Sequence, residues 1–127
     1  MNTAIINSDS YEKHDTGNGH PEQPKRVIAI KEKLKKRNDL IWEKPDIVPE
    51  KILEMTHSKD YINNLKNSFP QKGLNFLDGD TVVSPSSKKA IFEAAGSTIR
   101  PASRSESICL SISLISDSLC FRTWRRI

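Results

Sequence analysis

The segment HDTGNGHPEQPKR, residues 14–26, is the most informative part of this sequence, because a loop rarely carries two histidines, two glycines and two prolines directly before a helix. Its glycines build a turn, and Pro24 is tolerated in the first turn of a helix. Apolar residues then recur at helical spacing with lysines around the remaining circumference. They predict a helix over about residues 24–37, with three inward positions at Val27, Ile30 and Leu34.

A second segment, LDGDTVVSPSS at residues 77–87, leads into Ala94-Ala95-Gly96. The two segments together resemble the opening H-D-T-G-x-G-H-P-E-x-P-x-R motif and a later motif of the histone deacetylase family, in its acetoin-utilisation and acetylpolyamine-amidohydrolase branch. The resemblance covers roughly residues 1–100. It implies an α/β fold, the N-terminal portion of an arginase/deacetylase-type domain with a parallel sheet, mostly helical as it stands. A family catalytic domain needs about twice the length of this chain or more.

Short apolar runs predict strands in two places. Ala4-Ile5-Ile6 is typical of a buried parallel strand, so we expect an edge or early strand near residues 3–7. Prolines on both sides of Ile47-Val48 leave room for a second short strand there.

Four further segments carry helix or loop signals. Pro49 and Glu50 open a brief helix through Met55, and Ser58 is placed to cap a helix that ends before Pro70. Residues 71–79 are expected to form a loop. Ser84 and Pro85 then predict a helix to about Ile99. The expected inward residues are Tyr61, Ile62 and Leu65 in the first of these longer helices, and Ala90, Ile91, Ala94, Ala95 and Thr98 in the second.

The composition changes abruptly at Pro101. Residues 1–100 contain thirteen lysines and no cysteine, whereas residues 101–127 contain no lysine, seven serines and four arginines. A changed reading frame produces such a switch, so we expect residues 1–100 to be the deacetylase-like part and residues 101–127 to be a frameshifted, non-homologous tail. A natural Ser-rich extension is the alternative. Ile108 to Leu114 alternate in a β-type pattern that favours aggregation if uncovered, and Cys109 and Cys120 are expected to be free thiols.

The resemblance also implies a chemistry. Members of the family hydrolyse an acetyl amide on an amine, such as acetyl-lysine or an acetylpolyamine, with one zinc ion bound by two aspartates and a histidine and with a water that the metal activates. The family carries these groups in motifs of the types R-P-P-G-H-H and D-x-D-x-H-H, and neither occurs here. We therefore expect neither zinc nor activity in this chain alone, and assign no catalytic or metal-binding residue.

What the resemblance carries over is the edge and floor of the substrate channel. His20 and Pro21 match the first loop that edges the channel, and Arg26 matches an arginine that lines the cavity below the metal. Asp78 or Asp80 matches an aspartate of the second loop, which orients the substrate. The matching motifs leave open which of the two it is.

Each of these residues also has a purely structural interpretation. His14 and His20 could satisfy backbone groups in the glycine turn, and we favour this for His14. Arg26 lies four residues after Glu22, the spacing of an ordinary helical ion pair worth about 0.2–0.5 kcal/mol. His57, beside Ser58, is typical of a half-buried residue at a helix start, and Asp80 with Thr81 could simply shape a turn.

Two other classes of function remain as alternatives. A metal site could combine His14, Asp15, His20 and His57, although their spacing is poor. A small basic binding or interaction protein is the second alternative, since the net charge is +4. The basic residues are interleaved with acids instead of clustered, which argues against nucleic-acid binding. No membrane span or signal peptide is recognisable, so we expect a cytoplasmic protein whose uncovered apolar surface favours self-association.

Overall fold

The computed structural model describes residues 3–102 and 109–111, and its sheet is built around the first strand. β1 (Thr3–Ile6) lies between β2 (Leu40–Glu43) and β5 (Cys109–Ser111), and both neighbours run parallel to it. Ile5 is level with Trp42 on one side and with Leu110 on the other. Ala4, Ile5 and Ile6 are buried, as expected for an apolar run in a parallel sheet. The expected α/β class with a parallel sheet is confirmed, and so is an early strand near residues 3–7, which is an inner strand and not an edge strand.

The second strand lies elsewhere than expected. β2 covers residues 40–43, whereas Ile47 and Val48 are outside any strand. Val48 is buried and its amide donates to the carbonyl of Phe92 at 3.2 Å, so this segment is held by a helix and not by a sheet. Ile41 and Trp42 are neighbours in the sequence and are both partly exposed, at 46% and 36%. The strand therefore lacks the alternation of buried and exposed residues by which a sequence reveals a strand.

Helices make up most of the remaining regular structure. They are η1 (Tyr11–Lys13), α1 (Pro24–Leu34), α2 (Glu50–Leu53), α3 (Lys59–Asn67) and α4 (Ser87–Ala102). α1 begins at Pro24 as predicted and ends three residues before the expected end at Arg37. The brief helix α2 is also confirmed, although it stops at Leu53 and Met55 is 77% exposed.

The helix α3 follows its sequence signals closely. The Ser58 side chain accepts a hydrogen bond from the Tyr61 amide at 3.2 Å, which is the predicted cap. Ile62 is buried, and Tyr61 and Leu65 are half-buried. The predicted inward face is therefore confirmed.

The expected loop at residues 71–79 contains half of a small hairpin. β3 (Asn75–Phe76) pairs antiparallel with β4 (Val82–Val83), and the Leu77 amide donates to the Thr81 carbonyl at 2.9 Å across the turn. Strands of two residues are too short to show a period of two, so sequence reasoning missed them.

The last helix is displaced from its expected bounds, and its buried face agrees in part with the predicted one. α4 begins at Ser87 instead of Pro85, and it runs on to Ala102, so that the expected boundary at residue 101 falls within it. As predicted, Ala90 and Ala94 are buried, and Ile91 and Ala95 are half-buried. Thr98, however, is exposed, whereas Glu93 and Ser97 are buried. Most of residues 101–127, including Cys120, lie outside the described residues, and the proposed origin of this tail stays a prediction.

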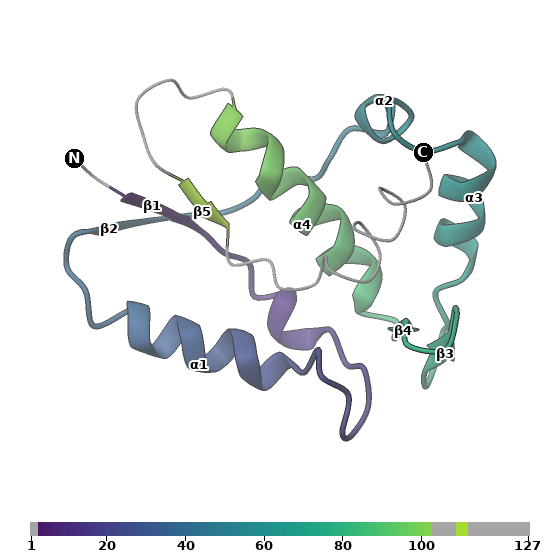
Figure 1. The fold of residues 1–127 in the computed structure, drawn as a ribbon, viewed down its shortest axis with the longest axis horizontal. Helices are drawn as coiled ribbons and strands as arrows, with labels where there is room; N and C mark the ends of the chain where they lie inside the picture. The colour runs from purple at the N-terminus through teal and green to yellow at the C-terminus, as the bar shows by residue number, and fades with distance from the viewer. Residues whose placement is uncertain (1–2, 103–108, 112–127) are drawn as a thin grey trace.

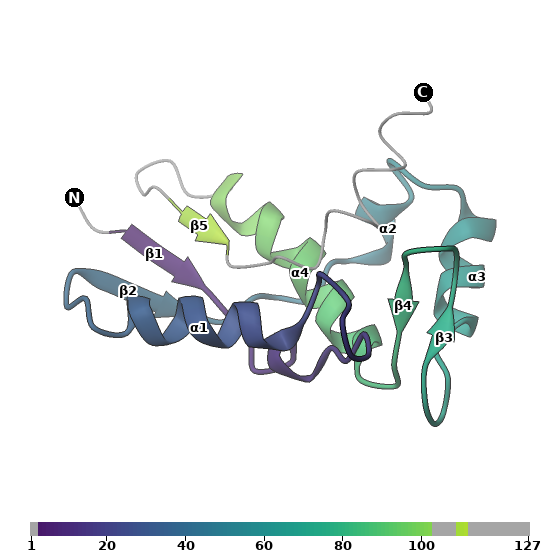
Figure 2. The same ribbon diagram turned by 60° about the horizontal axis from the view of Figure 1, so that its bottom comes forward.

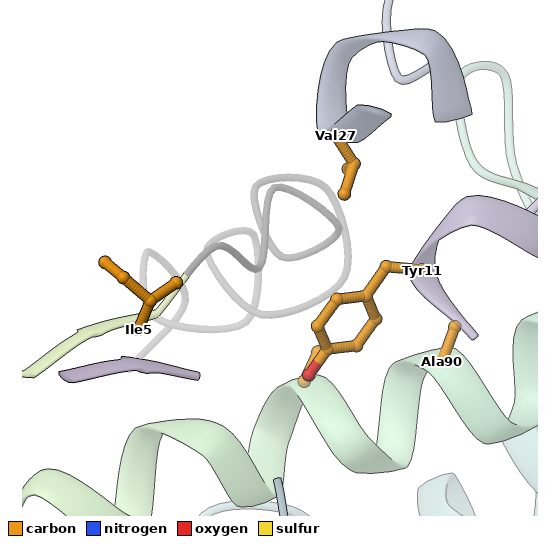
Figure 3. Packing of buried hydrophobic residues seen from close by; sticks show 5 residues of the cluster. Ile5, Tyr11, Val27 and Ala90 are labelled. Carbon is orange, nitrogen blue, oxygen red and sulfur yellow. The ribbon is translucent and has the colours of Figure 1, made fainter. Parts of the chain in front are cut away.

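The hydrophobic core lies where β1, η1, α1 and α4 meet. It consists of Ile5, Tyr11, Val27, Ala90 and Ala94, with Ile30, Leu34, Leu40 and Ile91 packed against it. The ring of Tyr11 lies between α1 and α4 (Figure 3). Lys31 on α1 reinforces this junction through ion pairs to Asp9 at 3.0 Å and Glu12 at 2.5 Å.

The elements are arranged around α4. Figures 1 and 2 show the three-stranded sheet and α1 at one end of the molecule, and α2, α3 and the β3–β4 hairpin at the other. Gly96 allows α4 to approach the segment before α2, since a Cβ on this glycine would lie 1.8 Å from the Asp46 carbonyl oxygen. In the ranges 3–102 and 109–111, no helix has the length and apolar character needed to cross a membrane.

Candidate functional site

The two sequence segments with a family pattern meet in space. His20 in the first loop contacts the carbonyl oxygen of Asp80 through Nε2 at 3.0 Å, across 60 residues of sequence. Its other ring nitrogen, Nδ1, accepts from the Glu22 amide at 3.1 Å. A neutral imidazole has one donor and one acceptor, so Nε2 carries the proton and donates to Asp80. The structure thus brings together His20 and Asp80, which sequence reasoning assigned to two separate loops.

The conformation of the first loop depends on its glycines. Gly17 and Gly19 have φ angles of 87° and 81°, a region that residues with a side chain rarely adopt. The Gly17 amide donates to the Asp15 carboxylate at 2.9 Å, and the Thr16 hydroxyl donates to the Glu22 carbonyl at 2.7 Å. These bonds fold the loop back on itself, so that its end reaches the start of α1.

Pro21 lies in this loop, and Arg26 follows it on α1. Both are exposed, and the Arg26 guanidinium donates to the Pro21 carbonyl at 3.1 Å. Arg26 therefore braces the loop in this structure. Its proposed place at the floor of a cavity is not tested by this contact and stays a prediction.

The second loop carries a turn formed by Asp78 itself. The Asp78 carboxylate accepts from the Asp80 amide at 3.1 Å. The pKa of Asp78 is lowered below its ordinary value, mainly by a hydrogen bond from the Thr81 hydroxyl and secondly by the bond from the Asp80 amide. Both aspartates are exposed. Asp78 has the turn-forming role that we had considered for Asp80 with Thr81.

His14 has a different environment from the one expected. Its side chain is only 3% exposed, and Nδ1 lies 2.7 Å from the hydroxyl of Ser87 at the start of α4. Burial lowers the pKa of His14 to about 4, with a smaller contribution in the same direction from His20. The interpretation that His14 satisfies backbone groups of the glycine turn is wrong, because its hydrogen bond goes to a side chain 73 residues away.

The hydroxyl of Ser87 gathers several partners at this point. It accepts from the Ser84 amide at 2.8 Å and lies 3.0 Å from the Ser84 hydroxyl. Because Ser84 directly follows β4, His14 and Ser87 fix the hairpin at its base while His20 contacts its tip.

Sequence reasoning missed a second buried polar group on α4. Glu93 is 8% exposed, and its Oε2 accepts from the hydroxyls of Ser8 at 2.6 Å and Ser10 at 2.5 Å. Lys89 lies 3.8 Å from its other oxygen. The sequence did contain a signal for this group, an acidic residue on a helix face of otherwise small and apolar residues. A carboxylate buried at such a position needs hydrogen-bond donors.

The alternative metal site is not formed. Among the described residues, no three His, Cys, Asp or Glu side chains come together in a way that could hold a metal ion. His57 instead stacks on Tyr61 with ring centroids 5.1 Å apart, which confirms its interpretation as a half-buried residue at a helix start. The described residues therefore do not fit the zinc ion that the resemblance implies.

Comparisons with known proteins identify the family and support the fold. A model of the histone deacetylase domain matches residues 20–108. An uncharacterized protein, slr0245, from Synechocystis sp. (strain ATCC 27184 / PCC 6803 / Kazusa) is 40% identical over 90 residues, which are 66% of this chain and 29% of that protein. The crystal structure of the HDA15 HD domain is similar with a TM-score of 0.73 and 19% sequence identity, over 87% of this chain and 35% of that one. The chain thus spans about a third of the length of each.

Proposed function

Because the chain belongs to the histone deacetylase family, we propose that its two linked loops form part of the rim of a substrate channel for acetylated amines. His20, Pro21, Asp78 and Asp80 would lie at the rim and Arg26 at its floor. The observation that supports this most is the hydrogen bond between His20 and Asp80, because it joins two loops that the family resemblance assigns to one channel.

Zinc enters this proposal only through the family, which is zinc-dependent. The described residues form no arrangement that fits a metal ion, and the 127 residues contain three histidines, none adjacent to another. We therefore assign binding and orientation of an acetylated amine to this chain, and no step of hydrolysis. The zinc ligands, and with them an activated water, would have to come from other residues.

The two aspartates would have different roles. The Asp78 carboxylate is engaged by the Asp80 amide and the Thr81 hydroxyl within the turn. Asp80 is held through its backbone, since its carbonyl accepts from His20. Asp78 accordingly maintains the turn, and the Asp80 side chain, at the tip that His20 holds, is our candidate for substrate contact.

The proposal is tested by a binding titration of the 127-residue chain. Nuclear magnetic resonance spectra would be recorded with N-acetyl-lysine amide and with acetylspermidine, using lysine amide and spermidine as matched controls. We expect only the acetylated compounds to shift the amide signals of Gly19, His20, Gly79 and Asp80. Equal shifts with the unacetylated controls, or shifts confined to other parts of the chain, would contradict the proposal.

Two variants separate the roles of the aspartates. Asp80→Asn should weaken binding by about fivefold, the loss expected for one hydrogen bond, and leave the spectrum of the free chain nearly unchanged. Asp78→Asn should alter the free spectrum at Asp80 and Thr81. We also expect no acetate release from an acetyl-lysine reporter with added zinc. Release that a chelator abolishes would show that the 127 residues hold a working zinc site.

A further inference from the structure

The ring of His20 bridges two backbone groups whose hydrogen-bonding roles cannot change. The Glu22 amide is always a donor and the Asp80 carbonyl is always an acceptor, and they lie 3.1 Å from Nδ1 and 3.0 Å from Nε2. The ring must therefore accept at Nδ1 and donate at Nε2. The neutral tautomer protonated at Nε2 is the single form of histidine that does both.

The turn that His20 contacts is closed by its own bonds. The Leu77 amide donates to the Thr81 carbonyl, and the Asp80 amide donates to the Asp78 carboxylate. These bonds set the shape of the turn, but they do not set its position relative to the first loop. The contact from His20 to the Asp80 carbonyl joins the tip of the turn to that loop.

We propose that His20 is a positioning residue, whose neutral ring protonated at Nε2 holds the Asp78–Asp80 turn against the first loop. His20 acts on the turn through the backbone of Asp80, so the inference concerns the placement of a carboxylate and not a contact with substrate. It rests on the proposed function only in treating the turn as part of a channel rim. The two hydrogen bonds of the His20 ring lie within the 127-residue chain and do not depend on a substrate.

Protonation of His20 would remove one of its two interactions. A doubly protonated ring keeps the donor at Nε2 but can no longer accept the Glu22 amide at Nδ1. Several charged or titratable groups are carried by the segments that meet at this ring. They are Asp15 and Glu22 in its own loop, Arg26 on α1, Asp78 and Asp80 on the turn, and the buried His14.

A matched pair of variants separates the two ends of the ring. The amide of Asn can place an oxygen near the position of Nδ1, so His20→Asn keeps the acceptor for Glu22 and loses the donor to Asp80. The longer Gln can place an NH2 group near the position of Nε2, so His20→Gln keeps the donor to Asp80 and loses the acceptor for Glu22. The measurement is amide hydrogen exchange on the isotope-labelled full chain, with the amides of Val27 and Ala90 as controls for global stability.

The expected result is a crossed pattern. His20→Asn should accelerate exchange at the Asp80 and Thr81 amides roughly three- to tenfold, the range expected for one lost hydrogen bond, and leave the Glu22 amide within about twofold. His20→Gln should accelerate exchange at the Glu22 amide and spare the turn. Equal effects of both variants at both places, or an unchanged turn in His20→Asn, would overturn the proposal.

The unmodified chain gives an independent test that does not depend on the variants folding. Long-range nitrogen correlation spectra of the His20 ring should show a protonated Nε2 and an unprotonated Nδ1 at neutral pH. A ring protonated at Nδ1 would refute the inference, whereas a failure to bind acetylated amines would affect only the proposed function.

Discussion

The burial of His14 predicts that acid destabilises this protein over a defined pH window. In the unfolded chain the imidazole has its ordinary pKa of 6.5, and in the folded chain burial lowers the pKa to about 4. Below pH 6.5 the unfolded chain therefore binds a proton that the folded chain does not bind until about pH 4. The stabilisation is fully present above pH 6.5 and is lost as the pH falls towards 4.

The size of the effect follows from the two pKa values. One pKa unit corresponds to about 1.4 kcal/mol, so this histidine should remove about 2 kcal/mol from the free energy of unfolding between pH 7.5 and pH 5. For a domain of this size such a loss is a large share of the total stability. Urea denaturation at both pH values, followed by far-ultraviolet circular dichroism, would measure it.

Carboxylates also titrate in this range, so the measurement needs a matched variant. His14→Asn places an amide near the Ser87 hydroxyl, 2.7 Å from Nδ1 in the unmodified chain, and cannot take up a proton. The unmodified chain should lose about 2 kcal/mol more than His14→Asn on acidification, because the carboxylates are common to both. Equal losses in the two proteins would refute the reasoning, and so would a folded-state titration of His14 near pH 6.5.

Three further outcomes follow from the packing. Gly96→Ala should lower the free energy of unfolding by about 1–3 kcal/mol in a urea titration, because the added Cβ would lie 1.8 Å from the Asp46 carbonyl oxygen. Gly79→Ala is the matched control: no atom lies within 4 Å of a Cβ at this position, so the free energy of unfolding should change little. Ser58→Ala should lower the free energy of unfolding by about 1 kcal/mol because it removes the cap of α3, and Ser58→Asp should restore most of this loss. Equal stability of the unmodified chain and the alanine variant would contradict the role of the cap. Ile41→Lys should reduce self-association in sedimentation equilibrium without lowering the urea midpoint, because β2 ends the described sheet and Ile41 is 46% exposed there. Unchanged association in this variant would place the contact elsewhere.

The sequence alone determined the features that depend on local signals. Pro24 with the apolar spacing after it predicted α1, Ser58 predicted the cap of α3, and the run Ala4-Ile5-Ile6 predicted β1. Each signal is complete within a few residues, so no distant partner was needed to recognise it. The motif in residues 14–26 likewise indicated the family, because its pattern of glycines, histidines and prolines is local.

The tertiary structure alone decided which of those residues act together. Burial lowers the pKa of His14, and its ring meets Ser87, which lies 73 residues further along the chain. The same holds for Glu93 between Ser8 and Ser10 and for His20 on the Asp80 carbonyl. Burial and hydrogen-bond partners are set by chain segments that meet only on folding. The sequence could therefore identify the two loops of the candidate site, while the link between them and the tautomer of His20 required the folded chain.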